Sequence, residues 1–390
     1  MRISSDHSIR VVFFVGAVFF GLGIYLPFFP VLLQERGFGA VELSILFSAP
    51  LFVKITVTPF LIGSVDRWGG RRNGTLLYAS AAFSAFFTFG QYEAFALALL
   101  FIALYGMFWS ALIPLGDTFT LFIVRNSDVS YGQIRLWGSV AFILGNVLSG
   151  VLLDVMGEKQ IFPILVSCSI LVIIAAYLLP TVSNDEKQVT NQNKRSIFQL
   201  IQNWPVGLKR ICFAAACVQA SHALLYTFGT VHWISLSFSA TMIGILWATG
   251  VVAEIILFIV APKFSKNLSA KTLVLIGSLA AIVRWSLTGH VEEYELVFLL
   301  QILHGLSFGA THLGLQMFIE QKMSDSDTPK AQGLVAFFSG LMMASATLGA
   351  GFAFDLFQGA AFWIMALVAA FGGGFLILQS GSTPKTGLGR

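Results

Sequence analysis

Long apolar runs alternate with short polar loops along the whole chain. Twelve of these runs approach the roughly 20 residues that a helix needs to cross a bilayer. None shows the period-two alternation of barrel strands, so helices are the expected spanning element. The sequence therefore predicts an all-α membrane protein with 12 transmembrane helices, near residues 9–33, 40–62, 74–92, 94–114, 131–153, 160–180, 209–233, 240–262, 271–289, 295–319, 331–354 and 359–379.

The longest polar stretch, residues 181–208, lies between the sixth and seventh predicted spans. It divides the chain into an N-terminal six-helix bundle, residues 1–180, and a C-terminal six-helix bundle, residues 209–390. Residues 181–208 are expected to form a cytoplasmic linker between them.

The two halves show weak internal similarity at an offset of about 200 residues. Such a repeat is common in transporters, whose halves are often related by a pseudo-two-fold axis. The offset superposes small and charged residues at matching depths, and the pairs are Gly132 with Gly333, Gly150 with Gly351, Asp154 with Asp355, Ala40 with Ala240 and Lys54 with Glu254.

Composition and charge support this interpretation. The chain is 56% hydrophobic and 11% charged, which is typical of a membrane protein and leaves no room for a separate soluble domain. Eighteen of the 23 Lys and Arg residues fall in the tails and loops on one side, and by the positive-inside rule both termini are cytoplasmic. The net charge of +4 thus reflects topology and not nucleic-acid binding. A multi-pass protein of the cell inner membrane is expected.

The charged residues that stand out within or near the predicted spans are Lys54, Asp117, Arg135, Glu254 and Arg284. A charge at the bilayer centre costs at least about 2.5 to 3.5 kcal/mol, so such residues are functional by default. The three cations outnumber the two carboxylates, which favours an anionic ligand over a neutral one. Arg135 could instead be a gating or interfacial residue.

Polar residues recur at helical spacing in two spans. One face carries Gln219, His222 and Tyr226, and the other carries His304, Ser307 and Thr311. Either set lines a pocket or forms hydrogen bonds to a neighbouring helix, and the sequence does not decide between these roles. Metal-binding His/Glu helices and Ser nucleophile motifs are missing from the sequence, so we expect neither an enzyme nor a cofactor.

The loop between the second and third predicted spans reads GSVDRWGGRR. It resembles the signature loop of the major facilitator superfamily, with Asp66, Arg67, Gly69, Arg71 and Arg72 at the matching positions. The resemblance implies a gating loop in which the Asp caps a helix end and the arginines bridge to neighbours. The match is imperfect, because the leading glycine stands three residues before the Asp instead of four. A simple positive-inside anchor is the alternative.

Several further segments resemble the phenylpropionate permease branch of this superfamily. They are GIYLPFFP, YGQIRLWGSVAF, QASHALLY, GVVAEIILF, VRWSLTG, QILHGLSF and FWIMALVA, spread from the first span to the twelfth. The resemblance implies the major facilitator fold of two six-helix bundles around a central cavity. It also implies proton symport of a small organic acid.

That branch is similar in turn to lactose permease, which implies roles for individual residues. Asp117 and Arg135 match its sugar-binding Glu and Arg, while Glu254, Arg284 and His304 match residues implicated in its coupling. Ser307 departs from the pattern, because lactose permease has its principal proton-carrying Glu there. Glu254 and Arg284 form either a responsive pair or a permanent structural one.

Together these observations predict a proton-coupled symporter that imports a small organic anion, such as the aromatic acid 3-phenylpropionate, by alternating access. The predicted substrate-binding residues are Lys54, Asp117, Arg135, His222 and Arg284, and the predicted proton-coupling residues are Asp117, Glu254 and His304. A sugar or nucleoside transporter, an exporter and, from another class, a membrane receptor are the alternatives. The expected partners are the substrate, protons and lipid, with no nucleic acid, and a monomer is expected.

Overall fold

The structure, a computed structural model, describes residues 5–181, 204–264, 267–324 and 327–378. Within these ranges the chain is almost entirely helical and contains no strand. Most of the predicted linker, residues 182–203, lies outside the described residues.

The helices of the first half of the chain are α1 (Ser5–Glu35), α2 (Ala40–Ser64), the short 3-10 helix η1 (Val65–Trp68), α3 (Arg71–Phe89), α4 (Phe95–Asn126), α5 (Tyr131–Met156), η2 (Glu158–Gln160) and α6 (Ile161–Leu178). The second half contains α8 (Val206–Ala220), the π-helical η3 (Leu225–Gly229), α9 (Thr230–Ser235), α10 (Ala240–Phe264), α11 (Ala270–Thr288), α12 (Tyr294–Ile302), the π-helical η5 (Gly305–Ala310), α13 (Thr311–Lys322), α14 (Thr328–Phe357), η6 (Gln358–Ala361) and α15 (Phe362–Leu378).

Ten helical segments among the described residues are long and apolar enough to cross a membrane. The helix α3 is not among them, since Arg71, Arg72 and Asn73 in its first turn dilute its apolar stretch. The last segment, Thr328–Leu378, is 51 residues long and joins two predicted spans. Gln358 interrupts it with a φ of 48°, a left-handed conformation that a continuous α-helix does not contain. The count of twelve spans stays a prediction.

The chain forms two compact units. The first contains the described residues within Met1–Val189, Leu224–Val251 and Thr347–Gln358. The second contains those within Thr190–Ala223, Val252–Ala346 and Gly359–Arg390. Because α10 and α14 each contribute residues to both units, the units do not coincide with the two predicted bundles, whose boundaries stay a prediction.

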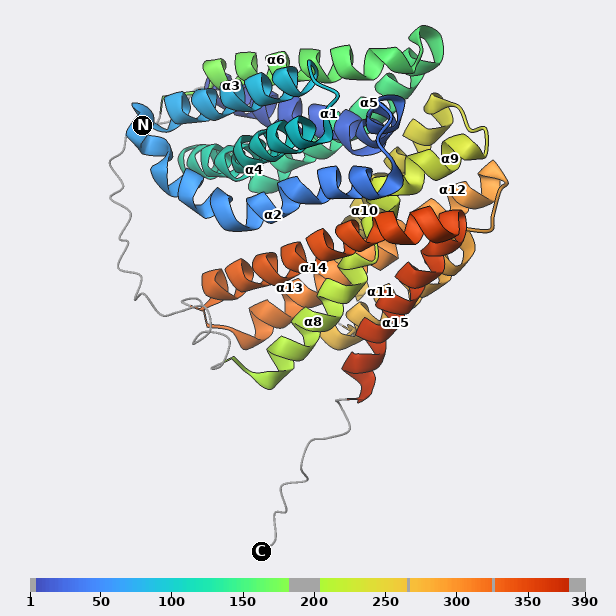
Figure 1. Cartoon of the computed structure of the whole chain (residues 1–390). Coiled ribbons are helices and arrows are strands. Elements are labelled where there is room, and N and C mark those ends of the chain that lie inside the picture. The colour runs from blue at the N-terminus through green and yellow to red at the C-terminus, as the bar shows by residue number, and fades with distance from the viewer. Residues whose placement is uncertain (1–4, 182–203, 265–266, 325–326, 379–390) are drawn as a thin grey trace, which may run out of the picture. The chain divides into compact units, whose positions relative to one another are not determined.

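In the first unit α1 packs along α5 and α6, α2 along α4, and α3 along α4 and α6 (Figure 1). Small residues allow the closest of these approaches. A Cβ added at Gly23 of α1 would clash with the carbonyl of Phe142 on α5, and one at Gly145 of α5 would lie 2.5 Å from the carbonyl of Phe20. Such small-residue contacts let two helix backbones pack by van der Waals attraction inside a membrane.

Two glycines paired by the internal repeat make equivalent contacts in this unit. A Cβ added at Gly150 would clash with the carbonyl of Ala240, and one at Gly351 would lie 2.8 Å from the carbonyl of Ala40. Ala40 and Ala240 are themselves a repeat pair. The crossing of α5 with α10 is therefore of the same kind as the crossing of α14 with α2.

Asp154 joins α5 to the N-terminus of α10. Its Oδ1 accepts a hydrogen bond from the amide of Ala240 at 2.8 Å, and its Oδ2 accepts one from the amide of Thr241 at 2.9 Å. A carboxylate is well suited to the first turn of a helix, where amides lack partners and the helix dipole is positive. Its repeat partner Asp355 is exposed, as Asp154 itself is.

Arg36, just beyond α1, supports the end of α3. Its guanidinium donates to the carbonyls of Phe89 at 3.1 Å and Gly90 at 3.3 Å and lies 4.5 Å from the centre of the Phe89 ring. Partial burial lowers the pKa of Arg36, and Glu35 and Glu93 act in the opposite direction. The arginine thus adds hydrogen bonds at a helix C-terminus, where carbonyls lack intrahelical partners.

In the second unit α11 packs against α15 and α13, and α8 packs against α15. The Ser278 hydroxyl of α11 donates to the carbonyl of Ala369 on α15 at 2.8 Å. Gly277 of α11 lies directly against Thr311, where any Cβ would clash with the Thr311 hydroxyl. This tight packing places α11 beside η5 and fixes the surroundings of Arg284.

Candidate functional site

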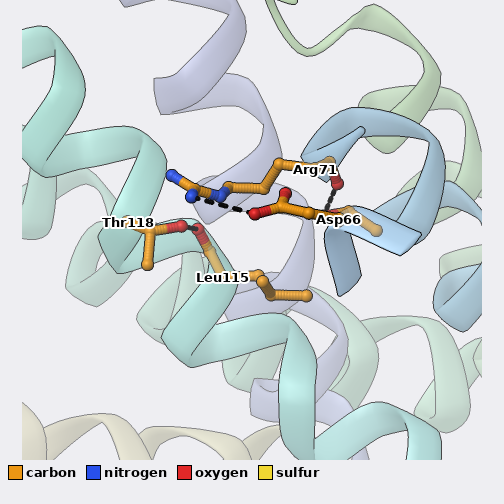
Figure 2. A network of polar contacts seen from close by, with 5 residues as sticks. Asp66, Arg71, Leu115 and Thr118 are labelled. Atoms are coloured by element: carbon orange, nitrogen blue, oxygen red, sulfur yellow. Dashed lines mark hydrogen bonds and ion pairs between the residues drawn. The ribbon is translucent and has the colours of Figure 1, made fainter. Parts of the chain in front are cut away.

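The signature-like loop forms a compact turn in the first unit. The side chain of Arg71 reaches back to Asp66, and their closest oxygen and nitrogen atoms lie 3.4 Å apart (Figure 2). The Gly70 amide donates to the Asp66 carbonyl at 3.2 Å. Gly69 and Gly70 have φ values of 83° and 100°, a left-handed region that side chains rarely adopt. The two glycines therefore allow the turn that brings Arg71 to Asp66.

The other arginines of this loop lie apart from that ion pair. Arg67 is exposed, whereas the guanidinium of Arg72 lies 5.1 Å from the centre of the Tyr177 ring on α6. Gly74 lets α3 approach the loop, because a Cβ there would clash with the Val65 carbonyl. The loop thus ties η1, α3 and α6 together, which is compatible with both the gating and the anchoring interpretations.

Asp117, Tyr131 and Arg135 form a polar cluster between α4 and α5 in the first unit. The Tyr131 hydroxyl donates to Asp117 Oδ1 at 3.0 Å. The Arg135 guanidinium lies 4.1 Å from the centre of the Phe19 ring, and its buried Nη1 has no hydrogen-bond partner among the described residues. The structure thus places Asp117 and Arg135 in one region with Tyr131, which the sequence did not single out, and a substrate-binding role for Asp117 and Arg135 stays a prediction.

Lys54 lies on α2 in the same unit, in a helix that also contains Pro50 and Pro59. Its side chain is accessible to solvent although the surrounding protein encloses it closely. A substrate contact by Lys54 stays a prediction.

Arg284 of α11 is the centre of a polar cluster in the second unit. Only 1% of it is exposed. Its Nη2 donates to Gln301 Oε1 at 2.5 Å, and its Nη1 donates to His304 Nδ1 at 3.0 Å and to Ser307 Oγ at 3.4 Å. These three acceptors are neutral, and the guanidinium lies 4.5 Å from the centre of the Trp285 ring. Hydrogen bonds and a cation–π contact thus replace water around a buried cation.

His222 completes this cluster from the end of α8. Its Nε2 lies 3.1 Å from Ser307 Oγ, and its Nδ1 lies 3.1 Å from the Val218 carbonyl. Both His222 and Ser307 are fully buried. Ser307 therefore lies between Arg284 and His222, at the position where the sequence comparison with lactose permease found its departure.

Aromatic rings surround the same groups. The His222 ring meets Trp285 edge to face, with centroids 5.0 Å apart, and Phe308 stacks on His304 at 5.2 Å. Phe362 of α15 also stacks on Trp285, with ring centroids 5.9 Å apart. The cluster thus combines one guanidinium with several apolar ring faces, a combination suited to a ligand with a carboxylate and an aromatic ring.

Glu254 of α10 packs against η5. Its Cγ lies 3.5 Å from the position that a Cβ of Gly309 would occupy, two residues beyond Ser307. The carboxylate-bearing side chain is therefore directed to the helix that also carries His304. A functional pairing of Glu254 with Arg284 stays a prediction.

Irregular helix geometry accompanies both histidines. His222 lies in the turn after α8, just before the π-helical η3, and His304 directly precedes the π-helical η5. A π-helical turn contains an extra residue and changes which side chains share a face, and such turns are frequent at functional sites. It brings Ser307 into the contact with both Arg284 and His222.

Two residues of this cluster were missed by the sequence analysis. Gln301 is neutral and therefore lacks the signal of a charge inside an apolar span, although its side chain forms a hydrogen bond of 2.5 Å with Arg284. Trp285 donates from its indole nitrogen to Ser221 Oγ at 2.9 Å, and its chain neighbour Arg284 was the only signal near it. Both residues lie within the quoted segments QILHGLSF and VRWSLTG.

Comparison with known proteins gives a consistent result. The profile of the MFS_1 like family matches residues 7–365, which is most of the chain. The chain belongs to the MFS_1 like family, within the major facilitator superfamily. It is 29% identical over 357 residues to the "Probable 3-phenylpropionic acid transporter" of Escherichia coli, covering 90% of this chain and 92% of the relative.

Two other proteins extend the comparison. The chain is 24% identical over 299 residues to the "Uncharacterized transporter YwbF" of Bacillus subtilis, covering 75% of this chain and 72% of the relative. The crystal structure of the nucleoside transporter NupG has the same fold, with a TM-score of 0.82 at 16% identity, covering 96% of this chain and 99% of NupG. This chain is therefore a multi-pass membrane transporter for a small molecule, and its relatives are transporters and not enzymes.

Proposed function

We propose that this transporter is a proton-coupled symporter that imports a small organic anion, with aromatic carboxylic acids such as 3-phenylpropionate as its substrate class. The observation that carries the proposal is the buried guanidinium of Arg284, held by Gln301, His304 and Ser307 and stacked on Trp285. The name of the 29% identical relative supports the same substrate class.

The chemistry of the Arg284 cluster suits a carboxylate. A guanidinium presents several N–H donors in a plane and binds carboxylates in a bidentate manner. Gln301 and His304 hold it through neutral acceptors. A carboxylate that reaches Arg284 would gain charge-assisted hydrogen bonds in surroundings of low polarity, and Trp285 and Phe308 would contact an aromatic ring.

Proton coupling is proposed to involve Asp117, Glu254 and His304. A buried carboxylate or imidazole changes its proton occupancy when a charge arrives nearby, so proton binding and anion binding become energetically linked. His304 already contacts Arg284 at 3.0 Å, and Asp117 lies next to Tyr131. In this proposal Arg135 and Lys54 supply further positive charge for the substrate.

Transport is proposed to proceed by alternating access, with the loop from Asp66 to Arg72 as the gating element. The Asp66–Arg71 ion pair and the left-handed glycines give this loop a defined geometry that a change of state would have to alter. We further propose a monomer in the cell inner membrane with both termini cytoplasmic. Reporter fusions to each terminus test the orientation, and a periplasmic reporter signal would contradict it.

The test of the function is uptake into proteoliposomes that contain the purified transporter. Aromatic carboxylates, sugars and nucleosides are offered at two external pH values, with the interior held at neutral pH. We expect aromatic carboxylates to accumulate and their uptake to rise at the lower external pH. Uptake of a sugar or a nucleoside alone would favour those alternatives, and uptake without pH dependence would exclude proton symport.

A further inference from the structure

The hydrogen bonds of His222 define which of its ring nitrogens carries a proton. Nδ1 lies 3.1 Å from the Val218 carbonyl and 3.2 Å from the Gln219 carbonyl, and a carbonyl can only accept. Nδ1 is therefore the donor, and in the neutral ring Nε2 is an acceptor. The Ser307 hydroxyl, 3.1 Å away, donates to Nε2.

His304 is bound in the opposite sense. Its Nδ1 lies 3.0 Å from Arg284 Nη1, and a guanidinium can only donate. Adding a proton to this nitrogen would place two donors against each other and break the contact that holds Arg284. A proton could thus reach His304 Nδ1 only with a rearrangement of side chains.

Ser307 makes His222 different, because a hydroxyl can exchange its donor and acceptor roles by rotation. When Nε2 of His222 binds a proton, Ser307 Oγ can accept from it and from Arg284 Nη1, at the present distances of 3.1 and 3.4 Å. Its own hydrogen can then turn to a carbonyl of the preceding helical turn, as the Ser221 hydroxyl does with Val218 and the Thr311 hydroxyl with Ser307. At these contacts a rotation of the Ser307 hydroxyl is enough to reverse its hydrogen bond with His222.

We propose that His222 binds the transported proton and that Ser307 is the hydroxyl that adjusts to it. This inference rests on the proposed function, and it replaces the substrate-binding role predicted for His222 in the sequence analysis with a proton-binding role. It also explains how coupling can persist where a serine replaces the acidic residue expected from the resemblance.

Charges around His222 make its proton dependent on the substrate. Arg284 of α11 is positive and opposes a second positive charge, and His304 lies with its ring centroid 5.3 Å from that of His222. Glu254 of α10 contacts the same η5 segment at Gly309 and favours the protonated ring. A substrate carboxylate at Arg284 would offset the guanidinium charge, so the proton and the anion bind together. One proton then accompanies each monocarboxylate, and transport is electroneutral.

The test compares His222→Asn with the wild type in proteoliposomes. Asparagine can keep a side-chain donor to the Val218 carbonyl but has no group that binds a proton. His312→Asn is the matched control, since His312 is an intramembrane histidine that stacks on Phe308 outside this hydrogen-bond chain. 3-Phenylpropionate is the probe. One unit of imposed pH difference should give the wild type and His312→Asn an accumulation ratio of about tenfold, because one proton moves with each anion.

For His222→Asn we expect an accumulation ratio near one, with exchange of labelled for unlabelled 3-phenylpropionate retained. Retained exchange shows that the variant is folded and binds substrate. Tenfold accumulation by His222→Asn would overturn the proposal. Loss of both exchange and accumulation would also overturn it if the variant matches the wild type in its chromatographic elution and its thermal midpoint. A wild-type ratio that changes when the membrane potential is clamped would overturn electroneutral coupling.

A second measurement separates this proposal from the proposed function. Ring ¹⁵N spectra of the substrate-free transporter, assigned with His222→Asn and His304→Asn, report each imidazole during acidification. We expect His222 to protonate before His304. The opposite order would overturn the assignment even where 3-phenylpropionate is transported. If the wild type transports no aromatic acid, the proposed function fails, and the order of protonation still decides whether His222 is the proton site.

Discussion

Replacing Gln301 by Glu provides a direct test of Arg284 as the anion site. The substitution changes almost nothing in shape, and Oε1 of Gln301 already lies 2.5 Å from Arg284 Nη2. It converts a neutral acceptor into a carboxylate that belongs to the protein. The new carboxylate would lie against Arg284 permanently, and a substrate carboxylate would have to compete with it for the guanidinium.

The magnitude follows from the contacts that the substrate would lose. A hydrogen bond to a charged group contributes about 1.5 to 3 kcal/mol, and each 1.4 kcal/mol is a factor of ten in affinity. Gln301→Glu should therefore weaken 3-phenylpropionate binding roughly 10- to 150-fold. The protein itself should not lose stability, because the new carboxylate is buried with a partner already within hydrogen-bond distance.

The assay measures the Kd of 3-phenylpropionate in detergent and its uptake in proteoliposomes, together with the thermal midpoint. Gln316→Glu is the matched control, since Gln316 Oε1 accepts from Gln332 Nε2 at 2.5 Å and a Glu can still accept there. We expect the control to retain its affinity. Wild-type affinity in Gln301→Glu, at an unchanged thermal midpoint, would refute the role of the Arg284 charge in binding.

Three further substitutions test the supporting structure. Asp154→Ala should lower the free energy of unfolding by about 0.5 to 2 kcal/mol, because the amides of the α10 N-terminus lose their cap. Asp355→Ala, at the exposed repeat position, is the control and should melt like the wild type. Gly150→Val should lower the thermal midpoint through its clash with α10, and Gly333→Val, which has open space, serves as the comparison. Asp66→Asn should lower the free energy of unfolding by at most about 1 kcal/mol, because the Asp66–Arg71 ion pair is part-exposed. A large loss of uptake rate without a loss of stability would support a gating role for this loop, and an unchanged uptake rate would argue against it.

The helical architecture could be predicted from the sequence because a bilayer leaves few alternatives. Every backbone polar group must be satisfied within its own segment, so a long apolar run becomes a helix whatever its detailed composition. The helix α2, for example, runs over Ala40–Ser64 where residues 40–62 were predicted. The helix α4 shows the limit of this reasoning. It was predicted to end at residue 114 but continues to Asn126, since Pro114 is tolerated within it and Asp117 and Thr118 extend it beyond the apolar run.

The buried cluster could be predicted only in part. Arg284, His304 and His222 stood out because ionisable residues are rare in apolar spans, and the structure places all three in one cluster. Their connection through Ser307 depends on the π-helical η5, whose extra residue per turn no apolar pattern reports. The spacing of His304, Ser307 and Thr311 predicted a shared face but not which neighbour each would contact.

Ser307 occupies a position where the resemblance predicts an acidic residue, and at this position the sequence and the structure lead to different expectations about proton coupling. Judged by residue type, a serine in place of a proton-carrying Glu removes a titratable group and casts doubt on coupling. In the structure the same serine accepts from a guanidinium and donates to an imidazole, so it connects two residues instead of carrying charge itself. Two related transporters can therefore carry the proton site on different, neighbouring helices while the arginine that binds the anion stays at the same position. Such a shift leaves no motif in the sequence, because its signature is a hydrogen-bond direction between residues 85 positions apart.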